Sequence, residues 1–282
     1  MKEFGPVVSP EWLRDHLLEP DLRLIDFRWY LLGRNGGDAY ASGHIPGAVF
    51  VDLEEVTGTE GGGRHPLPTG TQLAEAMRKA GVDSGTRVVA YDDAGGSIAA
   101  RLWFLLRWFG HGVQAVLDGG IQAWGEPLDT AVPSVRRGNF EWHEPDRSRV
   151  LDFDAVRRLS RVPLLDARAG ERYRGDREPV DPKAGHVPGA VSAPWMENLG
   201  PDGRFKSSEE LRKRLAALGA DGPRGAVVYC GSGVNACHDL LAMELAGLTN
   251  GRLYAGSWSD WASREAPIAT GSEPGSELTI PA

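Results

Sequence analysis

A strand, a glycine-containing loop and a helix are predicted to follow one another in the C-terminal half of this chain. The stretch reads Ala226-Val227-Val228-Tyr229-Cys230-Gly231-Ser232-Gly233-Val234-Asn235-Ala236. The apolar run before Cys230 is typical of a buried strand, and a helical pattern follows from roughly Asn235 to Leu245. Such a unit is the building block of a parallel sheet flanked by helices.

The same unit occurs a second time, because the chain is an internal duplication. Four pairs of segments match in the same order: Leu24–Arg28 with Leu164–Arg168, Gly43–Ala48 with Gly185–Ala190, Arg87–Asp92 with Gly225–Cys230, and Asp118–Trp124 with Ala255–Trp261. The period of about 140 residues is far longer than the roughly 20 to 50 residues of a solenoid repeat. Each copy is therefore predicted to be a whole domain.

Both copies are predicted to be small α/β domains with a mostly parallel sheet and helices on both faces. Ser207-Ser208-Glu209-Glu210 is a capping box that starts a helix ending at Gly219, and residues 69–81 form another helix with Leu73 and Met77 on its buried face. We place the domains at residues 1–135 and 149–282. The linker at 136–148 carries Phe140 and Trp142, which could pack across a domain face. The segment 58–70 is expected to be a loop, and the tail from about residue 271 to be mobile.

Composition limits the class of protein. With 282 residues, of which 41% are hydrophobic and 25% charged, the chain is expected to be globular with two domains. No run approaches the about 18 apolar residues of a membrane span and no export signal is recognised, so no membrane partner is expected. The only cysteines, Cys230 and Cys237, exclude a disulfide framework and favour a reducing cytoplasm. A net charge of -8 argues against nucleic acid but leaves room for a small anion held by local arginines.

Cys230 is the candidate nucleophile. A lone cysteine is usually an inert, buried small hydrophobe. Here the two glycines after it let the backbone curl and turn successive N–H groups inward, and the loop opens a helix. These amides and the helix dipole favour thiolate over thiol. Asp92 holds the equivalent place in the first copy, so only the second copy is expected to be reactive. Cys237 is expected to pack inside the helix, or at most to be a redox spectator.

The combination of motifs resembles a tandem-domain rhodanese over essentially the whole chain. The motifs are the Gly-His-(Ile/Val)-Pro-Gly-Ala element of both copies, the Cys230 loop and the segment Tyr254–Trp261. The resemblance implies a silent first domain and a second domain in which Cys230 takes sulfur from a small anionic donor as a persulfide. The acceptor would be cyanide or a thiol, with a thioredoxin-like reductant as a further partner. No metal or organic cofactor is implied.

The resemblance leaves two donors open, thiosulfate and 3-mercaptopyruvate. The tetrad Cys230-Gly231-Ser232-Gly233 looks more like the mercaptopyruvate branch, because the thiosulfate branch typically carries basic side chains after the cysteine. A mercaptopyruvate thiol needs a proton relay, and the resemblance implies that Ser232 works there with His44 of the first-domain motif.

Arginines are the expected donor-binding side chains. Arg172 matches the arginine that grips the donor anion, although a surface ion pair is the alternative for it. A second carboxylate-binding arginine is expected after Glu178-Pro179, but Val180-Asp181 follows instead. This departure leaves Arg177, just upstream, as the substitute and puts mercaptopyruvate specificity in doubt.

The remaining candidates have structural alternatives beside their functional ones. The loop residues Gly231, Gly233, Val234 and Asn235 are expected to contact the donor, and Trp29 and Trp195 to wall its pocket, with core packing as the alternative for the tryptophans. Asp166 and Arg168 are expected to form a buried pair that fixes the sheet edge, as Asp26 and Arg28 do in the first copy. Asp166 is also expected to steady the Cys230 loop. His44 and His186 occupy equivalent turns, so a structural hydrogen-bonding role is the alternative for both. Ser232 could simply shape its loop.

Other classes of protein fit less well. A cysteine phosphatase needs an arginine at the end of the loop to clamp phosphate, and Ala236 or Cys237 holds that place. A zinc site needs three or four clustered ligands, which the two cysteines and the histidines do not supply by spacing. A non-catalytic binding or sulfur-carrier module stays open on the precedent of the first copy, against which the intact cysteine loop argues. A monomer is expected, because the duplication supplies both halves in one chain.

Overall fold

The computed structural model describes residues 4–275, which divide into two compact units. The first unit contains the chain up to Gly58, then Pro68–Pro145 and Pro201–Arg204, and the second contains Thr59–Leu67, Asp146–Gly200 and the chain from Phe205 onward. The short segments Thr59–Leu67 and Pro201–Arg204 therefore belong to the second and the first unit, so the units are not continuous stretches of chain like the expected domains 1–135 and 149–282. The segment Thr59–Leu67 lies within the first repeat in sequence but belongs to the second unit in the structure.

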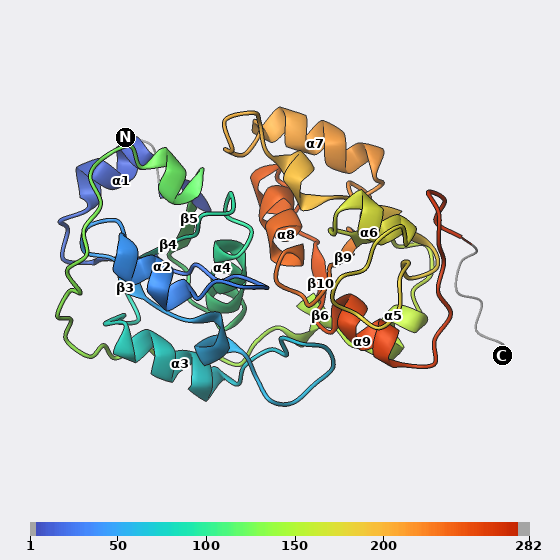
Figure 1. Cartoon of the computed structure of the whole chain (residues 1–282), viewed down its shortest axis with the longest axis horizontal. Helices are drawn as coiled ribbons and strands as arrows, with labels where there is room; N and C mark the ends of the chain where they lie inside the picture. The colour runs from blue at the N-terminus through green and yellow to red at the C-terminus, as the bar shows by residue number, and fades with distance from the viewer. Residues whose placement is uncertain (1–3, 276–282) are drawn as a thin grey trace. The chain divides into compact units, whose positions relative to one another are not determined.

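Each unit contains a five-stranded parallel sheet flanked by helices, which confirms the predicted α/β class (Figure 1). The strand orders are β1-β5-β4-β2-β3 and β6-β10-β9-β7-β8, which are the same topology. The strands of the first unit are β1 (Val7–Val8), β2 (Leu22–Asp26), β3 (Val49–Phe50), β4 (Arg87–Tyr91) and β5 (Gln114–Leu117). Those of the second are β6 (Val150–Leu151), β7 (Leu164–Asp166), β8 (Ala190–Ser192), β9 (Val227–Tyr229) and β10 (Arg252–Tyr254).

The helices alternate with these strands along the chain. The first unit has α1 (Pro10–His16), α2 (Gly36–Ser42), α3 (Gly70–Lys79), α4 (Ala99–Trp108) and the short 3₁₀ helices η1 (Leu53–Val56) and η2 (Gly120–Ala123). The second has η3 (Arg147–Arg149), α5 (Phe153–Arg157), α6 (Gly170–Arg174), η4 (Trp195–Asn198), α7 (Ser208–Ala217), α8 (Ala236–Leu245) and α9 (Ser257–Ser263). No helix among these residues has the length and apolar character needed to cross a membrane.

Helix ends follow the local sequence signals. The side chain of Thr69 accepts a hydrogen bond from the amide of Gln72 and starts α3, whose Leu73 and Met77 are fully buried as predicted. Ser207 and Glu210 form the predicted reciprocal capping box at the start of α7. Gly219, with a φ of 77°, follows the last turn of α7, where the left-handed conformation favours glycine.

The segment predicted as a linker packs on the first unit as far as Pro145. The Phe140 side chain is fully buried, and its amide donates to the carbonyl of Val82 at 3.1 Å. The Trp142 ring lies directly over Gly70, where a Cβ atom would come within 2.2 Å of it. These contacts agree with the expectation that both aromatic rings cover a domain face.

The predicted mobile tail is anchored in its first part. Gly271 donates to the carbonyl of Arg174 at 2.8 Å, and the carbonyl of Pro274 accepts from Gly189 at 2.7 Å. The rest of the predicted tail, residues 276–282, lies outside the described part of the chain.

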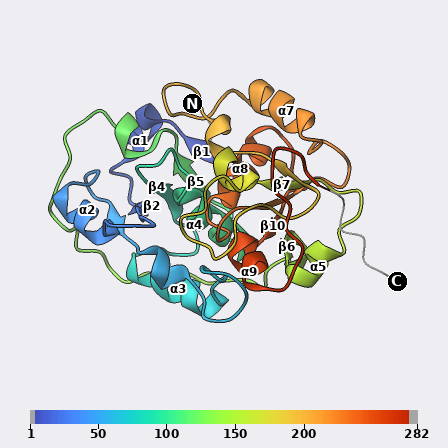
Figure 2. The same ribbon diagram turned by 45° about the vertical axis from the view of Figure 1, so that its right-hand side comes forward.

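Helix α9 is the element of the second unit that matters most for the site. It lies beside α5 in both views (Figures 1 and 2), and the Trp261 ring contacts the Phe153 ring at a centroid distance of 5.0 Å. Trp258 and Trp261 are fully buried in the same core as Tyr229 at the end of β9. The first turn of α9 is thereby fixed against the carboxyl end of the sheet.

Candidate active site

Cys230 lies at the carboxyl end of β9, a strand in the interior of its sheet. Strand register pairs Tyr229 with Asp166 of β7, so Cys230 comes directly after the last paired residue. In open α/β sheets this edge is where ligands bind. The cysteine is only 2% exposed, and its carbonyl accepts from the amide of Trp258 at 2.9 Å. Its surroundings are nevertheless polar, as the following contacts show.

Ser257 contacts the amide of Cys230, and sequence reasoning did not single it out. The Ser257 hydroxyl accepts from the Cys230 N–H at 3.1 Å and donates to the carbonyl of Tyr254 at 2.9 Å. Its φ is 54°, a left-handed conformation that costs a non-glycine residue about 1–2 kcal/mol. The first unit has Gly120 at the equivalent position, with a φ of 61°. Only the unit with the cysteine places a hydroxyl there.

The equivalent loop of the first unit shows what this backbone can hold. The Asp92 carboxylate, fully buried, accepts from the amides of Ala94, Gly96, Ile98 and Ala99 at 2.7 to 2.9 Å. Burial raises the pKa of Asp92, and the four amides oppose that rise. The loop is thus a cradle of N–H groups around an anion, and a carboxylate of the chain itself fills it.

The Cys230 loop is equivalent to the Asp92 loop in sequence, but it has a left-handed residue only at Gly233, where the Asp92 loop has two, Gly95 and Gly96. Counting from Cys230 in place of Asp92, the residues equivalent to the first three donors are Ser232, Val234 and Ala236. Within residues 4–275 their amides donate to no oxygen of the protein. Gly233 is required between them, because its φ is 79° and a Cβ atom would lie 2.5 Å from the carbonyl oxygen of Ala255. The amides of this cradle can therefore receive a negatively charged sulfur.

His65 is the histidine that contacts Ser232. Its Nδ1 atom lies 2.8 Å from the Ser232 hydroxyl oxygen, and both side chains are buried. The contact arises because the segment Thr59–Leu67 packs on the second unit, where the Arg64 amide donates to the Ser259 hydroxyl at 3.0 Å. A serine two residues from the cysteine and bonded to an imidazole is suited to proton transfer.

The assignment of His44 as the partner of Ser232 needs correction. His44 is fully buried in the first unit, where Nδ1 lies 2.9 Å from the carbonyl of Tyr40 and Nε2 lies 3.2 Å from that of Ala131. His186 contacts the carbonyls of Tyr173 and Glu273 in the same way. Both histidines therefore fix the turns of the repeated motif, and the residue hydrogen-bonded to Ser232 is His65.

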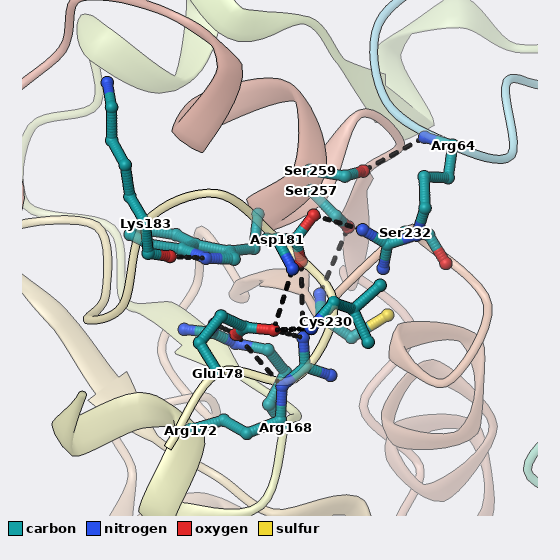
Figure 3. A network of polar contacts seen from close by, with 12 residues as sticks. Arg64, Arg168, Arg172, Glu178, Asp181, Lys183, Cys230, Ser232, Ser257 and Ser259 are labelled. Carbon is teal, nitrogen blue, oxygen red and sulfur yellow. Dashed lines mark hydrogen bonds and ion pairs between the residues drawn. The ribbon is translucent and has the colours of Figure 1, made fainter. Parts of the chain in front are cut away.

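Arg172 lies beside the loop, as the sequence suggested, and two carboxylates hold it. Its Nε donates to Glu178 at 3.1 Å, and its Nη2 donates to Glu178 at 2.7 Å and to Asp181 at 3.3 Å. Burial alone would raise the pKa of Glu178, but the Arg172 hydrogen bonds and the amides of Asp181 and Val180 bring it below the usual range. Asp181 also binds Arg64, and Figure 3 shows its carboxylate between the two arginines.

Arg177 does not take the place of the expected second arginine. Its side chain is 68% exposed and pairs only loosely, at 3.5 Å, with Glu171. Arg64 approaches the loop instead: a Cβ atom on Gly231 would lie 3.1 Å from Nη2 of Arg64 and 3.3 Å from Nη1 of Arg172. The second guanidinium at the Cys230 loop therefore comes from the segment Thr59–Leu67.

Asp166 and Arg168 form the predicted buried pair. Nη2 of Arg168 donates to the Asp166 carboxylate at 2.6 Å and to the carbonyl of Gly185 at 2.7 Å. The guanidinium also lies 4.6 Å from the ring centroid of Trp258. Burial alone would lower the pKa of Arg168, but Asp166 raises it above the usual value. The first unit repeats the arrangement with Arg28 and Asp26 at 2.6 Å, so the pair belongs to the fold and supports the strand end next to Tyr229.

The remaining predicted residues lie in various places around this centre. Val234 is buried, and Asn235 is half-buried just before α8. The rings of Trp195 and His238 on α8 pack edge to face with their centroids 5.2 Å apart, and Trp29 is half-buried in the first unit. A pocket-wall role stays a prediction for both tryptophans. Cys237 is fully buried, and its thiol donates to the carbonyl of Gly233 at 3.3 Å, which agrees with a packing role.

A scan against family models matches the rhodanese-like domain twice, at residues 9–127 and 153–264. A probable 3-mercaptopyruvate sulfurtransferase of Pseudomonas aeruginosa is 44% identical over 94% of this chain and 98% of that protein. A putative thiosulfate sulfurtransferase, SseB of Mycobacterium tuberculosis, is 40% identical over 85% of this chain and 87% of that protein.

Solved structures show the same likeness. The crystal structure of SseA from Escherichia coli, described as a 3-mercaptopyruvate sulfotransferase, is 31% identical, with a TM-score of 0.80 over 90% of this chain and 99% of that one. A sulfur transferase subunit of yeast mitochondrial complex I is also 31% identical, with a TM-score of 0.83 over 94% of this chain and 98% of that one.

Proposed function

Because this chain belongs to the rhodanese family and is a tandem-domain sulfurtransferase, we propose that Cys230 carries the transferred sulfur as a persulfide and that 3-mercaptopyruvate is its preferred donor. The observation that carries the choice of donor is the 2.8 Å contact between His65 and Ser232, two residues from the nucleophile. Its importance follows from the proton balance of the two candidate reactions.

With 3-mercaptopyruvate the Cys230 thiolate attacks the sulfur of the donor. The S–S bond forms while the donor's C–S bond breaks, and the leaving carbon departs as the enolate of pyruvate. The proton of the donor thiol must reach that carbon, which yields pyruvate and a persulfide anion on Cys230. The Ser232 hydroxyl and the His65 imidazole form the pair that can pass this proton.

With thiosulfate no proton moves. The thiolate attacks the outer sulfur, the bond between the two donor sulfurs breaks, and sulfite leaves with the electron pair. A serine–histidine pair beside the nucleophile has no task in that reaction. The loop Cys230–Val234 also contains no lysine or arginine that would favour a dianion.

The persulfide then loses its outer sulfur to a nucleophile. Cyanide attack gives thiocyanate and regenerates the Cys230 thiolate. A thiol acceptor takes the sulfur as its own persulfide, which a second thiol, such as that of a thioredoxin-like protein, can release as sulfide while a disulfide forms.

The persulfide is tested by mass spectrometry. After incubation with 3-mercaptopyruvate and without an acceptor, the intact protein should gain the mass of one sulfur atom, and peptide mapping should locate it on Cys230. Cys230→Ser should show no gain and no transfer to cyanide, whereas Cys237→Ser should behave like the wild type. A gain of sulfur on Cys237, or activity retained by Cys230→Ser, would contradict the proposal.

The choice of donor is tested by Ser232→Ala, with both donors assayed against cyanide. Loss of general acid–base catalysis should lower kcat/KM for 3-mercaptopyruvate by about 10²- to 10⁴-fold. The same variant should keep kcat/KM for thiosulfate within about threefold, because that reaction moves no proton. Equal losses with both donors would show that Ser232 shapes the loop and does not relay a proton.

A further inference from the structure

Two arginine nitrogens without a protein acceptor meet over Gly231, next to the nucleophile. A Cβ atom at Gly231 would lie 3.1 Å from Nη2 of Arg64 and 3.3 Å from Nη1 of Arg172. In the described part of the chain neither nitrogen donates to an oxygen of the protein. The Nε of Arg64 is buried without a partner there. Two guanidinium groups whose unpaired N–H donors converge on one point favour an anion at that point.

Carboxylates hold the other faces of both guanidinium groups. Glu178 binds Nε and Nη2 of Arg172, while the two oxygens of Asp181 bind Nη1 of Arg64 and Nη2 of Arg172. Glu178 also accepts from the amides of Val180 and Asp181 at 3.1 Å, which fixes the turn that carries Asp181. Figure 3 shows this network next to Cys230 and Ser232. The two free nitrogens are therefore held in place before any ligand arrives.

Arg64 reaches this position because its segment is docked on the start of α9. Its own amide donates to the Ser259 hydroxyl. A Cβ atom at Gly63 would lie 2.3 Å from the carbonyl oxygen of Gly256, and one at Gly62 would lie 2.3 Å from the Asp260 carboxylate. Only glycine permits this approach, so the residues before Arg64 are suited to bring its backbone against the second unit.

We propose that Arg64 is a specificity-determining residue that, together with Arg172, binds the carboxylate of the sulfur donor. It supplies the second cation in this chain, where Val180-Asp181 occupies the position at which an arginine is expected. A carboxylate offers one oxygen to each guanidinium, and charge-assisted hydrogen bonds of this kind are strong. The formal charges of the two arginines are balanced by Glu178 and Asp181, which suits a donor with one negative charge better than a dianion. The inference rests on the proposed function.

The test is steady-state kinetics with 3-mercaptopyruvate as donor and cyanide as acceptor. Arg64→Gln should raise the donor KM about 10- to 100-fold, the loss expected for one charge-assisted hydrogen bond, while kcat changes by less than about threefold. Arg64→Lys, which keeps the charge, should recover part of the loss. Arg177→Gln is the matched control, because it removes an exposed arginine of the same unit, and it should keep the wild-type KM.

A second measurement excludes a general disturbance of the site. Pyruvate has the donor's carboxylate and no sulfur, so its inhibition constant against the donor should rise in Arg64→Gln by the same factor as the KM. The KM for cyanide should stay within about twofold of the wild type. The role of Arg64 would be overturned if Arg64→Gln kept both the donor KM and the inhibition constant of pyruvate within about twofold of the wild-type values. If the wild-type protein formed no persulfide from either donor, the proposed function would be refuted instead. If it used thiosulfate alone, the binding of a donor carboxylate by Arg64 and Arg172 would be refuted.

Discussion

At the residue scale, the nucleophile is positioned by a serine in a conformation that serine rarely adopts. Ser257 has the left-handed φ that Gly120 has in the first unit, and its hydroxyl accepts from the amide of Cys230. Glycine would form this turn without strain, so the hydroxyl is the physical reason for a serine there. Strain is retained at the position where it fixes the backbone of the reactive cysteine.

Two substitutions of Ser257 separate the effect of its hydroxyl hydrogen bond from the effect of its strained backbone. Ser257→Gly removes both, whereas Ser257→Ala removes the hydroxyl and keeps the strain, so the alanine variant should be less stable than the glycine variant by about 1 kcal/mol. Both should form the persulfide about tenfold more slowly, because the buried Cys230 amide loses its acceptor. Thermal unfolding and single-turnover mass spectrometry measure these effects. A Ser257→Gly variant as fast as the wild type would show that the hydrogen bond has no part in catalysis.

Single site residues could be predicted where the sequence pattern that marks them lies within a few residues or recurs in both copies. Cys230 and its loop were identified because the strand, the glycines and the helix start are adjacent in sequence, and Asp166 and Arg168 because the pair recurs in both copies. His44 was misassigned for the same reason: recurrence in a copy without a nucleophile marks a structural residue. The loop before α7 reads Gly203-Arg204-Phe205 where the loop before α3 reads Gly63-Arg64-His65, so the arginine recurs and the histidine does not. This asymmetry was the signal that could have found His65.

At the element scale, the segment Thr59–Leu67 is the part of the site that sequence patterns could not place. Its glycines indicate a loop, and the structure has no helix or strand there. Its contacts, however, join residues far apart in the chain: 167 positions separate His65 from Ser232, and 117 separate Arg64 from Asp181. Helices α3 and α7 were predictable because caps and periodicity lie within a few residues, whereas loop docking depends on the packed surface of another repeat.

The docking of this segment predicts the effect of Gly63→Ala. The added methyl group would meet the carbonyl oxygen of Gly256 at 2.3 Å and should displace the segment together with Arg64 and His65. We expect kcat/KM for 3-mercaptopyruvate to fall at least about tenfold, as misplaced catalytic groups cause large losses. Gly33→Ala is the matched control, because its φ of 73° is equally left-handed and nothing lies within 4 Å of the new atom. Equal activity of the two variants would contradict the role of the docked segment.

Helix α8, which follows the Cys230 loop, carries a buried acid that makes stability depend on pH. Burial raises the pKa of Asp239 to about 7, and Arg214 and Asn198 only partly oppose this effect, while Glu197 and Asp166 add to it. One carboxylate oxygen accepts from Asn198 at 2.5 Å, and the other has no partner among the described residues. The mechanism proposed above does not use this acid.

The sign of the effect follows from proton binding. The unfolded chain releases the Asp239 proton near pH 3.8 and the folded protein near pH 7, so the folded state binds more protons between these values. The contribution of Asp239 is thus most favourable below about pH 4 and is lost as the pH rises through about 7. Relative to the wild type, Asp239→Asn should gain stability between pH 4.5 and pH 8 by on the order of a few kcal/mol. Urea unfolding at both pH values measures this, and an identical difference at both would contradict the assignment.

At the scale of the whole molecule, the two units have the same strand topology and differ in the residue that follows the equivalent strand, Asp92 after β4 and Cys230 after β9. The first unit fills the cradle with the carboxylate of Asp92, bound by four amides, and the second places Cys230 at that strand end. The duplication and the α/β class were predictable from four matching segments, since each is a continuous stretch of sequence. The assignment of Thr59–Leu67 to the second unit and of Pro201–Arg204 to the first was not predictable, because it leaves no mark on the periodicity or composition of the sequence.

The amides of the Cys230 loop are expected to bind the charge of the persulfide as the first unit binds the carboxylate of Asp92. A crystal structure of the protein after reaction with the donor, without an acceptor, tests it most directly. We predict electron density for one extra sulfur on Cys230, within hydrogen-bonding distance of the amides of Ser232, Val234 and Ala236. A persulfide whose outer sulfur points away from all three amides, or an extra sulfur on Cys237, would contradict the account.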